Sequence, residues 1–320
     1  MKRVLLRILP VVDVVLSPFT LIAALLLGLV RRVGVHRLPL SRSALFQAGV
    51  FPVRNHYYEP QFDFRDVPEV GRGVRPLPGI DWNEQGQTEV LRALTFGAEL
   101  ADLAGPDPGD GGFRLGNSNF ESGDAEYWYQ LIRWKKPRRI FEIGSGHSTR
   151  LAIRAIKRNQ MDDPGYTCRH VCVEPYEMPW LEASGVEVVR QKVESLGTGF
   201  FEELGVDDIL FIDSSHVIRA QGDVLFEYLQ LLPVLRPGVI VHVHDIFSPA
   251  DYPREWIVDE VRFWNEQYLL EAFLSHNAHW KILGALAWLT RNHHAELQCV
   301  APHLAPDRLP GSFYMQRLDR

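Results

Sequence analysis

Cysteine is scarce in this sequence, with three residues in a chain of 320. They are Cys168, Cys172 and Cys299, an odd and sparse set that excludes a disulfide framework. The spacing of Cys168 and Cys172 does not fit a zinc knuckle, because no second Cys or His pair follows at a suitable distance. We therefore expect a reducing environment for the part of the chain that carries them.

A surplus of basic residues is also lacking. Lys and Arg number 34 against 40 Asp and Glu, so the net charge is −6. Proteins that bind nucleic acid usually carry a basic surplus, and we expect no nucleic-acid partner here. Apolar residues make up 46% and charged residues 23%, which is typical of an ordinary globular protein. The length suits one large α/β domain with an N-terminal extension.

The most apolar stretch is Val14–Val30, which carries no charge and is followed by Arg31 and Arg32. It can be read as a membrane span, as a monotopic or hairpin anchor in one leaflet, as a buried helix, or as a cleaved signal. A signal is disfavoured because the two arginines stand where a cleavage site of small residues belongs. We predict a membrane-anchor helix or hairpin over residues 1–37.

Residues 38–112 are punctuated by Pro and Gly and predict an irregular or helical extension that forms a lid or the acceptor side. A helical pattern is clear over Gln87–Leu103, where apolar residues recur at helical spacing. The Gly- and Pro-rich stretch Gly105–Gly112 predicts a loop. Residues 113–320 are expected to form the main domain.

Within 113–320, short β-rich runs alternate with helical patterns. This alternation predicts an α/β fold with a doubly wound, mostly parallel sheet of seven strands. Ligands of such sheets bind at the carboxyl ends of the strands. The expected strands are Arg139–Glu142, His170–Glu174, Val186–Gln191, Ile209–Asp213, Val239–His244, Trp280–Leu283 and Phe313–Gln316. The expected helices are Asp124–Trp134, Ser148–Asn159, Arg219–Leu232 and Trp256–Phe273.

The strongest motif follows the first of these strands, which ends in Glu142 and continues into Gly144-Ser-Gly146. Two glycines let the backbone turn sharply and approach a ligand, and the helix after them offers free N–H groups. An acid before the turn is unhelpful for a pyrophosphate, but it suits a cofactor that carries an ammonium and ribose hydroxyls. Glu174, at the end of the second strand, can accept both hydroxyls of a ribose.

A second constellation lies at the ends of the fourth and fifth strands. Asp213 closes the fourth strand and His216 follows it, while His244 and Asp245 close the fifth. Neighbouring strand ends meet at one edge of the sheet, so these four side chains should gather beside the cofactor pocket. His242 shares a face with His244 but lies deeper in the strand, and we interpret it as a core histidine.

Together these motifs resemble class I S-adenosylmethionine-dependent methyltransferases of the catechol O-methyltransferase-like group, which includes sugar and polysaccharide-cluster O-methyltransferases. The likeness is closest over about Phe120–Trp256. It implies a Rossmann-like fold and S-adenosylmethionine as cofactor. The cofactor-binding residues it implies are Glu142, Gly144, Ser145, Gly146, His147, Ser148, Glu174 and Asp213.

In catechol O-methyltransferase, an Asp closing the fourth strand binds Mg²⁺ and a base follows three residues later. Asp213 and Asp245 match the metal positions, and His216 matches the base by position but not by residue type. His244 departs from the family, because it replaces an acid that Mg²⁺ would prefer. The site could therefore be metal-free, with His216 or His244 as base, or hold a softer divalent metal.

The resemblance implies an O-methyltransferase that acts on a hydroxyl of a glycan, a glycolipid precursor or another small acceptor. Its catalytic residues would be His216, Asp213, His244 and Asp245. With the anchor, we expect it at the cytoplasmic face of a membrane, where S-adenosylmethionine is available. Two other hypotheses remain: a metal-dependent hydroxylase on the same fold, and a membrane-tethered scaffold that binds the cofactor without catalysis.

Overall fold

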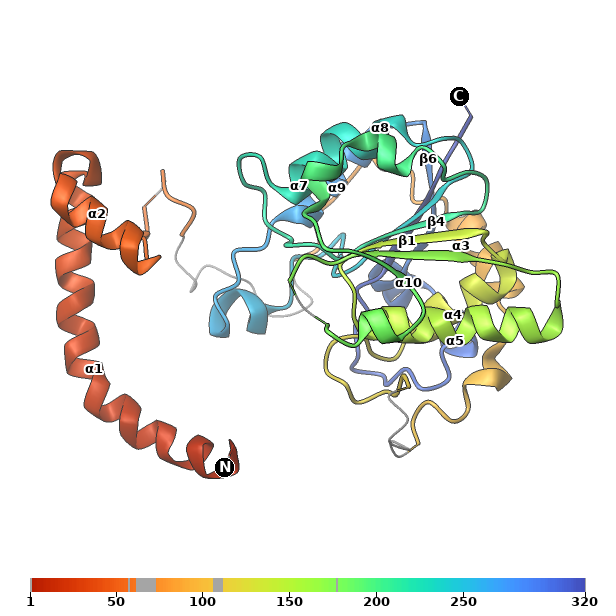
Figure 1. The fold of residues 1–320 in the computed structure, drawn as a ribbon, viewed down its shortest axis with the longest axis horizontal. Coiled ribbons are helices and arrows are strands. Elements are labelled where there is room, and N and C mark those ends of the chain that lie inside the picture. The colour runs from red at the N-terminus through yellow and green to blue at the C-terminus, as the bar shows by residue number, and fades with distance from the viewer. Residues whose placement is uncertain (1, 57, 62–72, 106–111, 177, 320) are drawn as a thin grey trace. The chain divides into compact units, whose positions relative to one another are not determined.

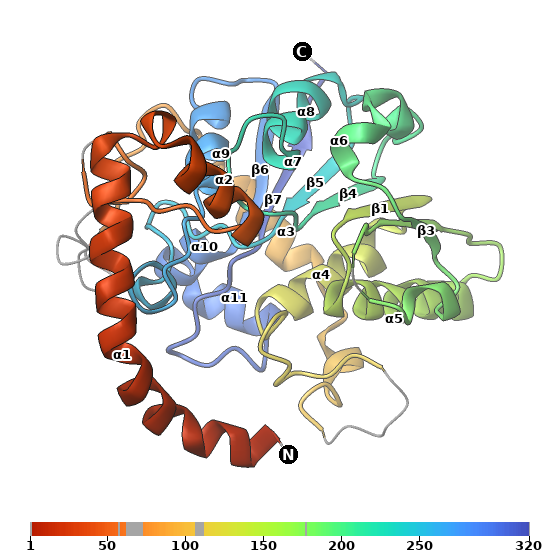
Figure 2. The ribbon, with the colours of Figure 1, turned by 60° about the vertical axis from the view of Figure 1, so that its left-hand side comes forward.

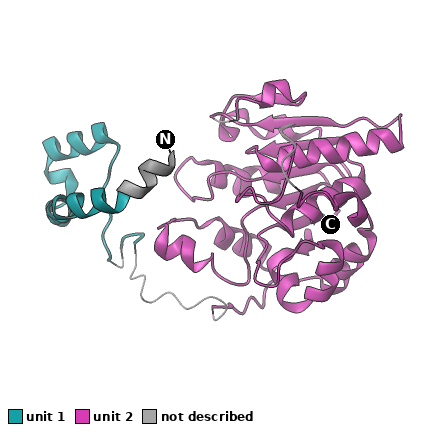
Figure 3. Cartoon of the chain, turned by 90° about the horizontal axis from the view of Figure 1, so that it is seen from below, with its two compact units in different colours: residues 1–68 teal, residues 69–320 magenta. Residues whose placement is uncertain are grey.

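The structure is a computed structural model that describes residues 2–56, 58–61, 73–105, 112–176 and 178–319. Side chains are described from residue 9 onward within these ranges. The chain divides into two compact units, Met1–Pro68 and Glu69–Arg320 (Figure 3). Each unit is described separately below.

The smaller unit is built on one long helix, α1 (Lys2–Val33), followed by a 3₁₀ turn, η1 (Val35–Arg37), and a short helix, α2 (Pro39–Ala48). Gly34 separates the first two, and its φ of 99° is open to glycine without strain. Pro39 starts α2 at the position where a missing N–H costs nothing.

An ion pair closes this unit. Arg31, near the end of α1, donates from Nε and Nη2 to the carboxylate of Glu59 at 2.9 and 2.8 Å. Arg54 approaches the same carboxylate at 3.6 Å. The segment after α2 is thereby held against the end of α1.

Apolar side chains of α1 are exposed rather than packed. The stretch Leu9–Val33 has 25 residues and a mean hydropathy of 2.2, and none of its most apolar window is buried. Among the described residues this is the one helix whose length and composition would allow it to cross a membrane, which is weak evidence by itself. At 1.5 Å per residue it is about 37 Å long, enough for a hydrocarbon core of about 30 Å.

The larger unit is organised around a seven-stranded sheet of order β3-β2-β1-β4-β5-β7-β6 (Figure 1). Six strands are parallel, and β7 runs antiparallel to its neighbours β5 and β6. This is the class I methyltransferase type of Rossmann-like sheet, and it confirms the predicted fold class. The strands are β1 (Arg139–Ile143), β2 (Arg169–Val173), β3 (Glu187–Val189), β4 (Ile209–Ile212), β5 (Ile240–Val243), β6 (Trp280–Ala285) and β7 (Phe313–Arg317).

Helices cover both faces of the sheet (Figures 1 and 2). The helices α4 and α5 lie together on one face, where Trp128 and Leu151 join the core. The opposite face carries the segment from α7 to α9, with Phe226 and Leu270 packed inward. The helices of this unit are α3 (Glu84–Ala93), α4 (Asp124–Lys135), α5 (His147–Asp162), α6 (Val193–Leu196), α7 (Asp223–Phe226), α8 (Leu232–Val234), α9 (Glu266–Leu274), α10 (Leu286–Asn292) and α11 (His294–Val300).

Shorter helical turns complete this unit. Two of them, η6 and η7, are π-helical, and the others are 3₁₀ turns. They are η3 (Gly97–Leu100), η4 (Leu181–Ala183), η5 (Thr198–Phe201), η6 (Glu227–Leu231) and η7 (Glu255–Asp259).

Three predicted helices are corrected. The helix expected over Gln87–Leu103 ends at Ala93, and Gly97 starts a separate 3₁₀ turn. The helix expected over Trp256–Phe273 is broken between η7 and α9, where the N–H groups of Asn265 and Glu266 donate to the carbonyl of His216 instead of to their own helix. The helix expected over Arg219–Leu232 begins only at Asp223.

The two units also divide the chain differently from the expected domains 1–37, 38–112 and 113–320. Residues 73–105 belong to the larger unit, because Leu91, Leu100 and Leu103 share one core with α4 and α5. Residues 38–61 belong to the smaller one, and the loop expected over Gly105–Gly112 lies mostly outside the described residues.

Candidate active site

The turn after β1 brings two strand ends into contact. Gly144 has a φ of 83°, and a Cβ there would lie 2.1 Å from the carbonyl oxygen of Asp213. Its N–H donates to Val173 at the end of β2 at 3.0 Å, while the N–H of Asp213 donates to Ile143 at 2.9 Å. Any side chain at Gly144 would push the turn away from β4. The glycine therefore sets the distance between the turn and the second constellation.

Below this turn lies a group of side chains that we call the closed cluster: Glu142, His170, Ser148 and Thr149. Glu142 is fully buried. One carboxylate oxygen accepts the hydroxyls of Ser148 and Thr149 at 3.0 and 2.8 Å, and the other pairs with Nε2 of His170. Both oxygens are thus occupied within the protein. These bonds fix the turn to the start of α5, and the contact of Glu142 and Ser148 with the cofactor stays a prediction.

Glu174 is placed as expected, directly after β2. Its carboxylate accepts the N–H of Ser145 at 3.3 Å and that of Tyr176 at 3.0 Å. These bonds tie the acid to the glycine turn. Glu174 and the backbone of 144–146 together form one wall of the predicted cofactor site.

His147 opens α5 beside this wall. Its Nδ1 is buried without a hydrogen-bond partner among the described residues. Burial, aided by the charge of Arg150, lowers the pKa of the ring. A neutral imidazole with an unsatisfied nitrogen is able to bond a polar ligand group at the start of the helix.

The second constellation forms as predicted, and we call Asp213, His216, His244 and Asp245 the open cluster. The Nε2 atom of His216 lies 3.2 Å from Oδ1 of Asp213 and 3.7 Å from Oδ2 of Asp245. Nδ1 of His244 lies 3.5 Å from Asp213 and 3.6 Å from Asp245. The Asp213 side chain is 34% exposed and that of Asp245 is 15% exposed, so both carboxylates are open to a ligand.

Two residues outside the predicted set hold His216 in place. Its Nδ1 lies 2.8 Å from Oε2 of Glu266, which is fully buried and also accepts the hydroxyl of Tyr228 at 3.0 Å. The ring of Trp264 lies 4.3 Å from the imidazole, centroid to centroid. Sequence reasoning missed Glu266 because it placed this residue within a continuous helix, where an acid suggests a solvent-facing position.

Charges in the open cluster stabilise one another. Burial opposes ionisation of Asp213, but the adjacent His244 and His216 outweigh it and lower the pKa of this carboxyl. Burial also disfavours a charged His216, yet Asp213 and Glu266 raise its pKa well above the ordinary value. The pKa of His244 is raised to about 9, because Asp245 and Asp213 outweigh its burial. Burial raises the pKa of Asp245.

His242 stays in the core, as interpreted from its strand position. It is fully buried, its Nε2 lies 2.9 Å from the Ser312 hydroxyl, and its ring stacks on Tyr314 at 4.1 Å. Burial and the charge of His244 lower the pKa of its ring well below the ordinary value. His242 therefore lies outside the open cluster, whereas His244, two residues later and directly after β5, belongs to it.

Comparison with known proteins finds a family match over part of the chain and one similar sequence. Residues 141–246 match the model of a family described as a methyltransferase domain. An uncharacterized protein of Archaeoglobus fulgidus is 26% identical over 170 residues, which cover 48% of this chain and 74% of that protein.

Two solved structures are similar at 15% identity. One is an O-methyltransferase from Bacillus cereus in complex with SAH, with a TM-score of 0.37 and coverage of 73% of this chain and 91% of the other. The second is the plantazolicin methyltransferase BpumL in complex with a triazolic desmethylPZN analog and SAH, with a TM-score of 0.35 and coverage of 62% and 84%.

The family match spans β1 to the end of β5, and so contains the glycine turn, Glu174 and the whole open cluster. This segment of the chain is therefore similar to a methyltransferase domain.

Proposed function

We propose that this protein is an O-methyltransferase that methylates a hydroxyl of a glycan or glycolipid precursor at the cytoplasmic face of a membrane. One observation carries the proposal most directly. The glycine turn after β1 and the open cluster meet at the same edge of the sheet, where Gly144 touches the backbone of Asp213. A methyl donor held by the turn would therefore lie beside polar groups able to position and deprotonate an acceptor.

The residues around the turn fit S-adenosylmethionine. Glu174 follows β2 beside the glycine turn, where a carboxylate can accept ribose hydroxyls, and the unsatisfied nitrogen of His147 lies at the same wall. Gly144 keeps the backbone close enough for a ligand to span from Glu174 to Asp213. When bound, this cofactor supplies an electrophilic methyl group.

Positioning of the acceptor is assigned to Asp213 and Asp245, whose side chains are partly exposed. Since His216 and His244 have raised pKa values, each holds a proton at neutral pH and balances the two carboxylates. We therefore give His216 a positioning role in place of the predicted base. Asp245 would accept the proton that the acceptor hydroxyl loses when the oxygen of that hydroxyl is methylated. Holding the reactants in line supplies much of the rate.

A divalent metal also fits the open cluster. Asp213, His216 and Asp245 each offer a ligand atom, and these atoms lie within 4.8 Å of one another. The bond from Nδ1 of His216 to Glu266 would leave Nε2 for the metal, the arrangement usual for histidine ligands. A metal held there would lower the pKa of a coordinated hydroxyl. Two carboxylates with one imidazole suit Mn²⁺ or Zn²⁺ at least as well as Mg²⁺.

Membrane association is supported by the exposed apolar side chains of α1 and by the arginines at and just after its end. A helix of this length that is unpacked in its own unit gains stability by entering a bilayer. Arg31, Arg32 and Arg37 would then lie at the headgroup level, where anionic lipids attract them.

Calorimetric titration of the purified full chain tests the central claim. S-adenosylmethionine and S-adenosylhomocysteine should bind in the micromolar range, and NAD⁺ should not. Repeating the titration with Mg²⁺ and Mn²⁺ tests the metal. Absence of binding by both sulfur ligands would overturn the proposal and favour the hydroxylase. Normal binding without methyl transfer to isolated membranes or glycan fractions would favour the scaffold.

Flotation with lipid vesicles tests the anchor. The full chain should float with vesicles that contain anionic lipid, whereas the variant Leu21→Lys/Leu25→Lys should stay in the soluble fraction. Equal behaviour of both proteins would remove α1 from membrane binding.

A further inference from the structure

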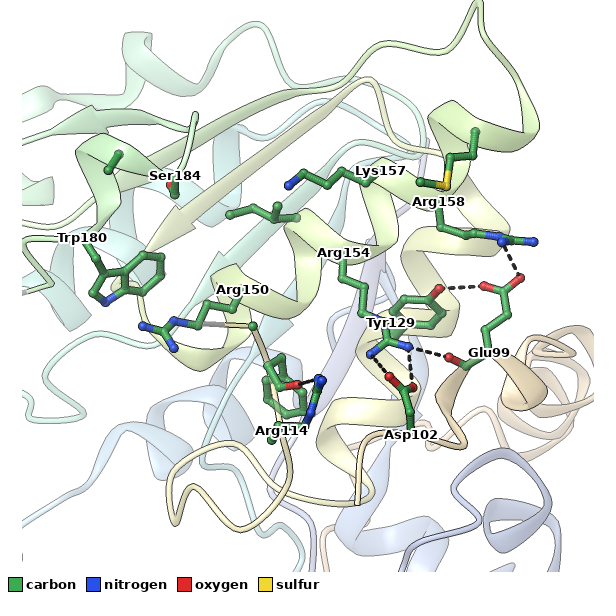
Figure 4. A pocket seen from close by; sticks show the side chains of 15 residues that line it. Glu99, Asp102, Arg114, Tyr129, Arg150, Arg154, Lys157, Arg158, Trp180 and Ser184 are labelled. Atoms are coloured by element: carbon green, nitrogen blue, oxygen red, sulfur yellow. Dashed lines mark hydrogen bonds and ion pairs between the residues drawn. The ribbon is translucent and has the colours of Figure 1, made fainter. Parts of the chain in front are cut away.

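A cavity lies on the outer face of α5, away from the sheet, with a volume of about 700 Å³ (Figure 4). We call it the α5 groove. One side is formed by α5 itself and the other by Trp180, Ala183 and Ser184. Its size falls within the range of small-ligand sites. The remaining lining residues are Glu99, Asp102, Gly112, Phe113, Arg114, Tyr129, Arg150, Ile153, Arg154, Lys157, Arg158 and Met161.

Basic residues outnumber acidic ones in this lining, five to two. Two of the basic residues are neutralised. Arg154 bonds both oxygens of Asp102 at 2.6 and 3.1 Å, and Arg158 lies 3.7 Å from Glu99 and 3.5 Å from Asp162. These ion pairs engage both acidic residues that line the groove, Glu99 and Asp102.

The other three form no hydrogen bond or close ion pair with a carboxylate within the described part of the chain, although Arg114 interacts with Asp102 at longer range. Arg114 donates only to the carbonyl of Phe113, at 2.6 Å, and its Nε is buried without a partner there. Arg150 reaches across the groove, with its guanidinium 4.4 Å from the ring centre of Trp180, and Lys157 extends to the same side (Figure 4). Unpaired cations around a cavity in a chain of net charge −6 favour an anionic ligand.

Spacing decides the form of that ligand. Arg150 and Lys157 are seven residues apart on one helix, which places them on the same face and about 10 Å apart along its axis. Two cations spaced along the groove in this way suit two acidic groups better than a single phosphate or carboxylate. We propose that the α5 groove binds an extended ligand with at least two acidic groups, such as an acidic oligosaccharide or an oligophosphate.

The groove also leads toward the candidate active site. Arg150 lies in the first turn of α5, and the ring of Phe113 in the groove lies 6.3 Å from that of His147 at the cofactor turn. An extended ligand along α5 would point one end toward the edge of the sheet where methyl transfer is proposed. That this ligand is the acceptor depends on the function proposed above, but its binding does not.

Calorimetry on the full chain tests binding with three probes: tripolyphosphate, trigalacturonate and the neutral trisaccharide maltotriose. We expect at least one acidic probe to bind and maltotriose not to bind. The variant Arg150→Gln/Lys157→Gln should weaken acidic binding at least tenfold. The control Arg92→Gln/Lys281→Gln changes the net charge equally at residues outside the groove and should bind like the wild type. Thermal unfolding of each variant checks that the fold is retained.

The two acidic probes separate the sources of the ligand. Preference for trigalacturonate indicates an acidic glycan, and preference for tripolyphosphate indicates a phosphate-bearing ligand. Binding of neither, or equal binding by both double variants, would overturn the inference. Because no methyl donor is present in the assay, failure of the groove and failure of the proposed methyl transfer are read independently.

Discussion

The closed and open clusters join the same chemical groups at the same edge of one sheet, yet they differ in what they leave for a ligand. Each pairs an imidazole with carboxylate: His170 with Glu142, and His216 with Asp213 and Asp245. Glu142 is fully buried and both of its oxygens have protein donors. The Asp213 side chain is 34% exposed. Exposure and unspent acceptor capacity therefore distinguish a site from a scaffold, even where both pair an imidazole with a carboxylate.

An acid-to-amide change in the open cluster should have the largest effect on activity. We expect Asp245→Asn to slow methyl transfer about 10²–10⁴-fold, because the amide cannot accept the proton of the acceptor. The fold should survive, since the side chain is partly exposed. Incorporation of labelled methyl groups from S-adenosylmethionine into isolated membranes or glycan fractions measures the rate. Transfer at the wild-type rate would exclude Asp245 from the mechanism.

The same kind of change in the closed cluster should lower stability instead. Glu142→Gln removes one carboxylate oxygen that serves buried donors, at a cost of about 2–3 kcal/mol. The melting temperature should fall by roughly 5–10 °C. Thermal unfolding of Glu142→Gln beside Asp245→Asn makes the comparison directly. If the open-cluster variant melted lower than Glu142→Gln, the distinction between scaffold and site would be wrong.

Glu174 follows β2 beside the glycine turn, and its substitution should have an intermediate effect. We expect Glu174→Ala to weaken binding of S-adenosylhomocysteine about 10–100-fold, because ribose hydroxyls would lose their acceptor. Calorimetric titration gives the affinity. The matched control is Glu182→Ala, which removes an acid between β2 and β3 that pairs with Arg190. Unaltered affinity in Glu174→Ala would refute the ribose assignment.

Sequence patterns predicted the sheet and the position of both strand-end motifs because these depend on local alternation and on chain order. All seven strands lie within a few residues of their expected bounds, and Asp213, His216, His244 and Asp245 converge as expected. The direction of a side chain is not a local property. Glu142 could not be recognised as buried scaffold from its place in the motif, since His170 reaches it from the next strand.

Glu266 shows the same limit from the other side. It reaches His216 across fifty residues of sequence, and only because the backbone breaks between η7 and α9. That break depends on the carbonyl of His216. His216 has a φ of 59°, a backbone conformation that is itself set by the tertiary structure. A helical pattern over Trp256–Phe273 contains no signal for either feature.

Glu227 lies behind the open cluster and accepts the hydroxyl of Ser214. Its substitution should have the smallest effect on stability. It is fully buried, and burial, with the nearby Glu266 and Asp223, raises its pKa well above the ordinary value. The folded protein therefore keeps a proton that the unfolded chain loses above its ordinary pKa of about 4.5. This contribution to stability is complete at acidic pH and declines as the pH rises toward the folded pKa.

Glu227→Gln mimics the protonated side chain and should abolish this decline. We expect its melting temperature to equal that of the wild type near pH 4.5 and to exceed it by roughly 2–5 °C at pH 8. The bond from the Ser214 hydroxyl is retained by the amide oxygen, so packing is unchanged. Thermal unfolding across this pH range measures the difference. If the difference in melting temperature between variant and wild type were the same at all pH values, Glu227 would be ionised in the folded protein. The negative charge around His216 would then include Glu227 as well as the open cluster and Glu266.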